Sequence, residues 1–236
     1  MPSPAWLAHL YTALGSVLAL YATLAVFEGA FRAAFLSLAV ATFIDTTDGW
    51  LARALRVKAR LPGYDGGRLD DIVDYLTYVF VPVLLVLEAG LLPAGWGGWV
   101  GAAVLLASAY GFGQADAKVA TTDHFFTGFP SYWNIVSLYM YVLHLPMGVN
   151  AAILVALAVL VFVPIRYVYP SRTVALRVPT LALGAIWGLL VIAVIWRLPA
   201  TDGPWATLSL VFPVYYVALS LYLHGQDQKQ DRQTGG

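Results

Sequence analysis

Two short segments of the sequence carry acidic side chains at a spacing that suits metal and phosphate chemistry. Residues 45–53 read DTTDGWLAR, and residues 66–74 read GGRLDDIVD. Helical residues three or four positions apart share one face, so each segment directs two carboxylates the same way. These carboxylates belong to Asp45, Asp48, Asp70 and Asp74. If a loop joins the two helices, we expect the four side chains to lie close together.

Four neighbouring carboxylates repel one another unless cations neutralise them. Ligand sets made only of oxygen atoms are typical of hard divalent cations such as Mg²⁺ and Mn²⁺. Two such ions would balance the four negative charges and could also bind a diphosphate. The sequence therefore predicts a divalent metal site, with two ions of either Mn²⁺ or Mg²⁺.

Small residues and one arginine accompany the carboxylates. Gly49 and Ala52 share the face of the first acidic pair, and Gly66 begins the second segment. Small side chains let a ligand approach the helix backbone. Arg53 adds a fixed positive charge that suits a phosphate or an aspartate. The alternative for each small residue alone is close helix packing, which is common in membrane proteins.

The elements that carry these residues are apolar helices. The chain has 236 residues, of which 60% are hydrophobic and 11% are charged, whereas soluble domains have about 25% charged residues. Cysteine is absent, so thiol catalysis and disulfides are excluded, and a net charge of zero gives no reason to expect a nucleic-acid partner. A membrane-spanning helix needs roughly 20 apolar residues. Eight stretches meet this requirement: 5–27, 31–53, 69–92, 96–115, 131–148, 149–168, 178–197 and 204–224.

The predicted fold is an all-α, polytopic integral membrane protein with about eight transmembrane helices. Residues 1–224 are expected to form a single catalytic domain in the lipid bilayer, and the polar tail 225–236 is expected to be disordered. Basic residues follow the second, fourth, sixth and eighth stretches, and only Arg32 and Arg197 lie on the opposite side. Because lysine and arginine favour the cytoplasmic side, both termini and the acidic segments are predicted to face the cytoplasm.

The ordered set of small, basic and acidic residues resembles a known family motif. The pattern is Asp45-x-x-Asp48-Gly49-x-x-Ala52-Arg53 followed by Gly66-x-x-x-Asp70-x-x-x-Asp74. It is similar to the signature of the CDP-alcohol phosphatidyltransferases. The intervening residues 54–65 make a longer gap than the commonest version of the motif has, and this gap resembles that of the bacterial phosphatidylcholine synthases. The resemblance covers most of the chain, with the first six helices as the family core and the last two as additions.

This resemblance implies an enzyme of the bacterial inner membrane that transfers a phosphatidyl group from CDP-diacylglycerol to choline, giving phosphatidylcholine and CMP. It implies that the metal ligands are Asp45, Asp48, Asp70 and Asp74. Asp74 would also be the general base for the choline hydroxyl. The residues bordering the CDP moiety would be Gly49, Ala52, Arg53 and Gly66. Thr12 is a further candidate for CDP binding, although helix packing accounts for it equally well. The family also suggests a homodimer.

Choline carries a quaternary ammonium group, which aromatic faces usually bind. The segment 124–134, HFFTGFPSYWN, is rich in aromatic residues. The choline-binding candidates are Phe129, Tyr132 and Trp133, with Tyr64 and Tyr75 closer to the carboxylates in sequence. For any one of these rings, an ordinary aromatic belt at the membrane interface is the alternative.

Two other functions remain open at this stage. Another member of the superfamily would use serine, inositol or glycerol 3-phosphate as the acceptor. A cation transporter is a distant alternative, because transporter sites usually lie near the bilayer midplane on broken helices. Four further polar residues receive no role: Asp71, His124, Arg166 and Arg172.

Overall fold

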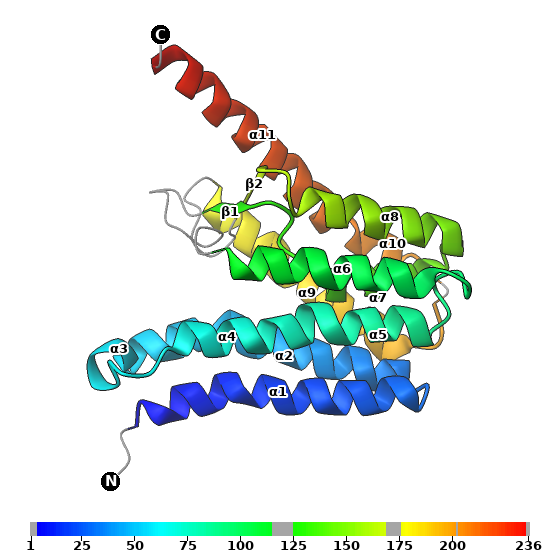
Figure 1. Cartoon of the computed structure of the whole chain (residues 1–236), viewed down its shortest axis with the longest axis horizontal. Helices are drawn as coiled ribbons and strands as arrows, with labels where there is room; N and C mark the ends of the chain where they lie inside the picture. The colour runs from blue at the N-terminus through cyan, green and yellow to red at the C-terminus, as the bar shows by residue number, and fades with distance from the viewer. Residues whose placement is uncertain (1–3, 115–124, 169–175, 202, 235–236) are drawn as a thin grey trace.

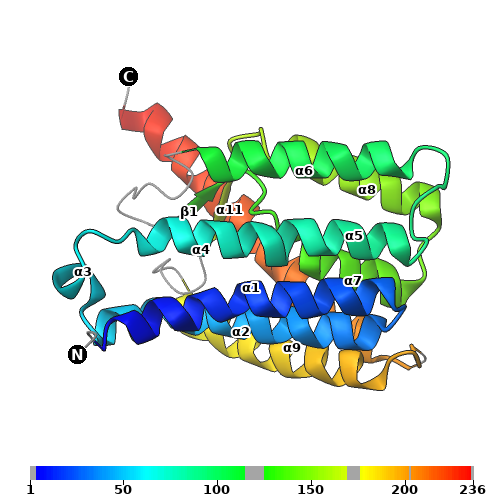
Figure 2. The same cartoon turned by 60° about the horizontal axis from the view of Figure 1, so that its bottom comes forward.

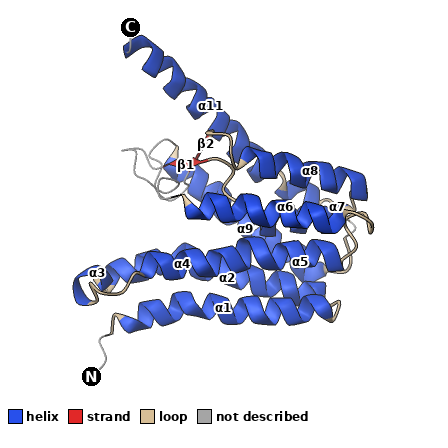
Figure 3. Ribbon diagram, in the orientation of Figure 1, coloured by secondary structure: helices blue, strands red, loops and turns tan. Residues whose placement is uncertain are grey.

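The apolar stretches of the sequence fold into helices that run side by side (Figures 1 and 3). The computed structural model describes residues 4–114, 125–168, 176–201 and 203–234. Its helices are α1 (Trp6–Phe27), α2 (Phe31–Ala54), α3 (Val57–Arg60), α4 (Gly66–Asp74), the π-helix η1 (Tyr75–Phe80), α5 (Val81–Glu88), α6 (Gly97–Gly113), α7 (Trp133–Leu143), α8 (Met147–Leu160), α9 (Arg177–Arg197), α10 (Trp205–Ser209) and α11 (Val211–Thr234). Two short strands, β1 (Phe125–Thr127) and β2 (Arg166–Val168), pair antiparallel.

The structure confirms an α-helical membrane protein. Among the described residues, three helices are long and apolar enough to cross a membrane: Trp6–Phe27, Arg177–Arg197 and Trp205–Gln226. Helices α7 and α8 have only 11 and 14 residues, fewer than the roughly 20 that a full crossing needs. The predicted stretches 131–148 and 149–168 are therefore longer than the helices they contain, because α7 ends at a turn at His144 and α8 ends at a turn that leads into β2.

The predicted stretch 69–92 forms one continuous helical segment, in which the π-helix η1 lies between α4 and α5 (Figure 2). Asp65 caps the start of α4, where its Oδ1 accepts hydrogen bonds from the backbone N–H groups of Gly67 and Arg68. The π-helical turn η1 begins directly after Asp74. Pro82 has no N–H to donate to the carbonyl of Tyr78, so the regular α-helical hydrogen bonding is interrupted there.

The C-terminal helix differs from expectation. The sequence predicts a disordered tail from Gly225, but α11 continues to Thr234 and extends away from the other helices (Figure 1). The residues after Gly225 include glutamine, lysine and arginine, which favour helices. Extending a helix that has already formed costs much less than starting one. The polar composition after Gly225 therefore ends the apolar stretch that the sequence predicts, but it does not end the helix.

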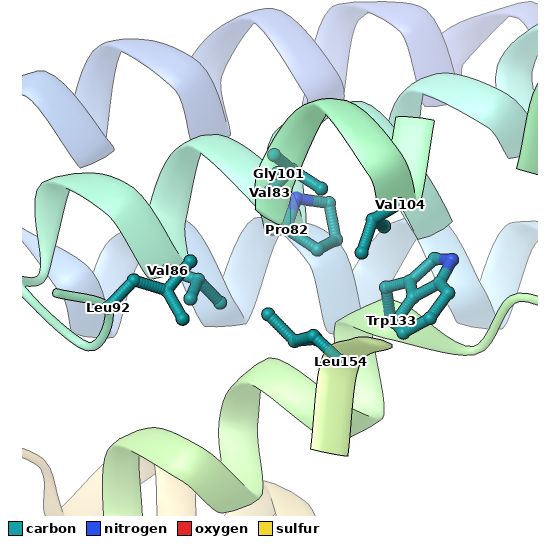
Figure 4. Close-up of a pocket in the computed structure, with 8 residues that line it drawn as sticks. All are labelled: Pro82, Val83, Val86, Leu92, Gly101, Val104, Trp133 and Leu154. Carbon is teal, nitrogen blue, oxygen red and sulfur yellow. The ribbon is translucent and has the colours of Figure 1, made fainter. Parts of the chain in front are cut away.

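The first and last described residues lie at the same end of the helical bundle. The first and last described segments, the short helix α3 and the two strands all gather there in both views (Figures 1 and 2). Near this end, α1 packs against both α2 and α4. An apolar cavity lies elsewhere in the bundle and contains no acidic residue in its lining (Figure 4). Its lining residues are Pro82, Val83, Val86, Leu92, Gly101, Val104, Trp133 and Leu154.

Close packing between α1 and α4 depends on Gly15. A Cβ atom added there would clash with Cγ1 of Val73. Because overpacking a helix contact typically costs about 1–3 kcal/mol, we expect Gly15→Ala to lower the thermal stability of the purified protein in detergent. Gly188→Ala in α9 is the control, since a Cβ at Gly188 meets no neighbouring atom within 4 Å. Equal melting temperatures for the two variants would contradict this explanation of Gly15.

Candidate active site

Three of the four motif aspartates meet between α2 and α4. One carboxylate oxygen from each of Asp45, Asp70 and Asp74 lies within 4.8 Å of the other two. All three side chains are half-buried. Oxygen ligands lie about 2.0–2.1 Å from Mg²⁺, so ligands on opposite sides of the ion are about 4 Å apart. The spacing and the oxygen chemistry of this acidic triad therefore fit a small divalent cation with little adjustment.

The fourth aspartate, Asp48, contacts helix α1. Thr12 Oγ1 donates a hydrogen bond of 2.7 Å to Asp48 Oδ2, and both side chains are buried. Asp48 is not a member of the acidic triad. The structure thus places Thr12 beside a motif aspartate, while metal binding by Asp48 and nucleotide binding by Thr12 stay predictions.

Tyr78 contacts the acidic triad from the π-helical turn η1. Its hydroxyl donates a hydrogen bond of 2.7 Å to Asp45 Oδ2, and its side chain is buried. Tyr78 follows Asp74 by four positions, a separation that keeps side chains on nearly the same helix face. This tyrosine, which the sequence did not single out, fixes the orientation of one acidic side chain.

The small motif residues have visible packing partners. A Cβ at Gly49 would lie 3.2 Å from Nη1 of Arg53, so the guanidinium group folds back over this glycine. Ala52 packs against a small apolar cluster that joins α1 to α3. A Cβ at Gly66 would lie 2.7 Å from Cε1 of the buried His9 ring. These contacts support the packing alternative, and contact of the four residues with CDP stays a prediction.

The five predicted choline-binding rings lie in different surroundings. Tyr64 packs on His9 with ring centroids 4.4 Å apart. Tyr75 donates a hydrogen bond of 3.0 Å to the carbonyl oxygen of Leu105. Trp133 is 1% exposed, its Nε1 donates to Ser108 Oγ, and its ring lines the apolar cavity (Figure 4). The contacts of these three rings are packing or hydrogen-bond contacts within the protein.

The other two rings, Phe129 and Tyr132, lie in a series of neighbouring aromatic side chains. The Tyr132 ring is 6.1 Å from that of Tyr78. The series also contains Tyr167 and Tyr216, which the sequence did not single out. The sequence signal for Tyr216 is its spacing of four residues from Ser220 and eight from His224, which puts three polar groups on one face of an apolar helical segment.

Four polar residues had no predicted role, and the structure describes two of them, Asp71 and Arg166. Asp71 is half-buried and lies outside the acidic triad. Arg166 belongs to β2, and its backbone N–H donates to His224 Nδ1. His124 and Arg172 fall outside the described residues.

Comparison with known proteins agrees with the motif. The family model for CDP-alcohol phosphatidyltransferase matches residues 5–222. A phosphatidylcholine synthase of Legionella pneumophila is 39% identical over 225 residues, which cover 92% of this chain and 88% of the relative. Phosphatidylcholine synthases of Bradyrhizobium diazoefficiens and Pseudomonas aeruginosa are each 36% identical, and the matches cover 93% and 92% of this chain and 81% and 91% of the relatives.

The chain therefore belongs to the CDP-alcohol phosphatidyltransferase family, and it is a membrane-embedded transferase. This family generally uses divalent metals, and the acidic triad offers a place for one.

The hydrogen bond from Tyr78 to Asp45 gives a test of metal binding. Removing a group that orients a metal ligand typically weakens metal affinity about ten-fold or more. We therefore expect Tyr78→Phe to weaken Mn²⁺ binding about ten-fold, measured by electron paramagnetic resonance on the purified protein. Tyr11→Phe is the control, because it removes a comparable hydrogen bond of 2.8 Å to Thr47 Oγ1. Unchanged Mn²⁺ affinity in Tyr78→Phe would show that this tyrosine does not orient a metal ligand.

Proposed function

We propose that this protein acts as a phosphatidylcholine synthase, which transfers the phosphatidyl group of CDP-diacylglycerol to choline and releases CMP. The observation that carries the proposal is the meeting of Asp45, Asp70 and Asp74 at the motif of this family. The relatives named phosphatidylcholine synthase support choline as the acceptor. They match nearly the whole chain, so they cover the additional C-terminal helices as well as the motif helices.

The proposed metal ligands are the acidic triad together with Asp48, and two ions, Mn²⁺ or Mg²⁺, would balance the four charges. Carboxylate oxygens are suitable ligands for either ion. Divalent cations bound there would screen the charge of the diphosphate and polarise its oxygen atoms. Arg53 lies beside Gly49 and five residues after Asp48, where its positive charge could bind a phosphate of the same substrate.

The proposed reaction is a direct displacement at phosphorus. Asp74 accepts the proton of the choline hydroxyl while the choline oxygen forms a bond to the β-phosphorus, which carries the diacylglycerol. The bond from this phosphorus to the oxygen that bridges to CMP breaks, and CMP leaves with the electron pair. A choline hydroxyl is a weak acid, so the enzyme must hold both substrates in the correct orientation for the reaction to proceed.

We propose that the protein lies in a bacterial inner membrane and that its active site is on the cytoplasmic side. Both ends of the described chain lie at the same end of the bundle (Figures 1 and 2), and the basic residues of the sequence concentrate on one side. Choline is soluble and would arrive from the water, whereas the acyl chains of the other substrate remain in the bilayer. Homodimerisation, which the family suggests, stays a prediction.

The proposed acceptor can be tested directly with purified protein. CDP-diacylglycerol and Mn²⁺ are supplied with choline, serine, inositol or glycerol 3-phosphate in separate reactions, and CMP release is measured. We expect CMP release that depends on choline, with phosphatidylcholine as the product. Turnover with serine alone, or CMP release that does not require choline, would reject choline as the acceptor.

The role of Asp74 as the base gives a second test. Asp74→Asn removes the proton acceptor with little change in volume, so we expect it to abolish choline-dependent CMP release while the protein remains folded. Asp71→Asn, three positions earlier on α4 and outside the acidic triad, is the matched control and is expected to retain turnover. Folding is checked by size-exclusion chromatography and thermal unfolding. Substantial turnover by folded Asp74→Asn would remove Asp74 as the base.

A further inference from the structure

Three polar side chains of α11 fix the position of strand β2. Tyr216, Ser220 and His224 are spaced by four residues and share one helix face. Tyr216 donates a hydrogen bond of 3.0 Å to the carbonyl oxygen of Val168, and the Val168 N–H donates one of 3.1 Å to Ser220 Oγ. The Arg166 N–H donates one of 3.4 Å to His224 Nδ1. Because β1 also pairs with β2, the strand is positioned by neighbours on both sides.

These contacts bring together aromatic rings from distant parts of the chain. The Tyr216 ring lies 6.4 Å from that of Tyr167 in β2 and 6.2 Å from that of Tyr132. Phe129 lies 6.5 Å from Tyr167, and Tyr78 lies 6.1 Å from Tyr132. Tyr132 and Tyr216 are only partly buried, so parts of their surfaces remain accessible, whereas Tyr167 is buried and packs beside Tyr216.

The series of rings ends at the acidic triad. Tyr78 contacts Tyr132 with its ring and donates its hydroxyl hydrogen to Asp45. In choline, only two carbon atoms separate the ammonium nitrogen from the hydroxyl oxygen. An enzyme that removes the hydroxyl proton at Asp74 must therefore bind the ammonium group immediately beside the acidic triad. In the described structure, Tyr132 is a predicted choline-binding ring that contacts Tyr78, and Tyr216 contacts Tyr132.

We propose that Tyr132, Tyr167 and Tyr216 form the binding site for the quaternary ammonium group of the acceptor, an inference that rests on the proposed function. A quaternary ammonium has no N–H to donate, so aromatic faces within about 6 Å are its typical protein partners. The rings make interplanar angles of 61° (Tyr132 with Tyr216) and 18° (Tyr167 with Tyr216), so their faces point in more than one direction. The nearby carboxylates add long-range attraction for a cation.

In this proposal, different elements carry out catalysis and recognition of the acceptor. The motif helices α2 and α4 carry the carboxylates that act on the diphosphate and the hydroxyl. Strand β2 and helix α11, which lie far from the motif in sequence, supply two of the three rings that recognise the acceptor. Removing the ring of Tyr167 in β2 or of Tyr216 in α11 should therefore alter the affinity for choline without altering the affinity for CDP-diacylglycerol.

The test compares Tyr216→Leu and Tyr167→Leu, which remove a ring, with Tyr216→Phe, which keeps the ring and removes the hydroxyl that donates a hydrogen bond to Val168. Tyr222→Leu is the control, because Tyr222 is a tyrosine of the same helix that is 62% exposed. For each purified variant, kcat and KM are measured with choline, with CDP-diacylglycerol, and with 3,3-dimethylbutan-1-ol, an uncharged analogue of choline of the same shape. KM does not depend on the amount of folded enzyme, so partial unfolding cannot imitate the expected result.

We expect each leucine variant to raise the KM for choline about ten-fold, which is within the range of one cation–π contact. The preference for choline over the uncharged analogue should decrease in parallel, and KM for CDP-diacylglycerol should stay the same. Tyr216→Phe, which keeps the ring, should raise the KM for choline less than Tyr216→Leu does, and Tyr222→Leu should resemble the unmodified protein. An unchanged KM for choline in the leucine variants, or equal losses with choline and the analogue, would overturn the inference while choline remains the acceptor. No turnover of choline by the unmodified protein would overturn both the inference and the proposed function.

Discussion

The close approach of three carboxylates is the constraint on which the rest of this structure depends. Two unit charges 4.8 Å apart repel by about 3 kcal/mol at an effective dielectric constant of about 20. A bundle that holds Asp45, Asp70 and Asp74 together must therefore supply compensating groups. Tyr78 donates a hydrogen bond to Asp45, and Thr12 donates one to the neighbouring Asp48. Each donor comes from a helix other than that of its acceptor, so the acidic site stabilises the packing that surrounds it.

The small residues around the motif follow from the same constraint. Thr12 can reach Asp48 only if α1 lies close to the motif helices, and this close approach leaves no space for side chains at certain positions. Gly15 faces Val73 on α4, and Gly66 faces the ring of His9 on α1. Gly15 and Gly66 thus serve the packing of α1 whether or not a nucleotide also lies against them. Substituting one of them would disturb the carboxylates indirectly, through the position of α1.

The sequence predicted what depends on local spacing and missed what depends on contacts between distant segments. The helical repeat of the aspartates correctly placed Asp70 and Asp74 beside Asp45, and the apolar composition correctly predicted a helical membrane protein. No periodicity reveals that Tyr78 contacts Asp45 or that Tyr216 contacts Tyr132, because these pairs come from different elements. Apolar composition also overestimated the lengths of α7 and α8, because the turns that end these helices contain apolar residues too.

The strand pair explains why α11 carries the polar residues Tyr216, Ser220 and His224 on one face. A strand leaves backbone N–H and C=O groups without partners along any open edge, and such groups are costly where water is scarce. Tyr216, Ser220 and His224 bind these groups of β2, so α11 is held to the strand by hydrogen bonds in addition to apolar contacts. The same contacts fix the Tyr216 and Tyr167 rings relative to each other. Under the proposed function, a helix outside the motif would therefore set the shape of the acceptor site without taking part in the phosphorus chemistry.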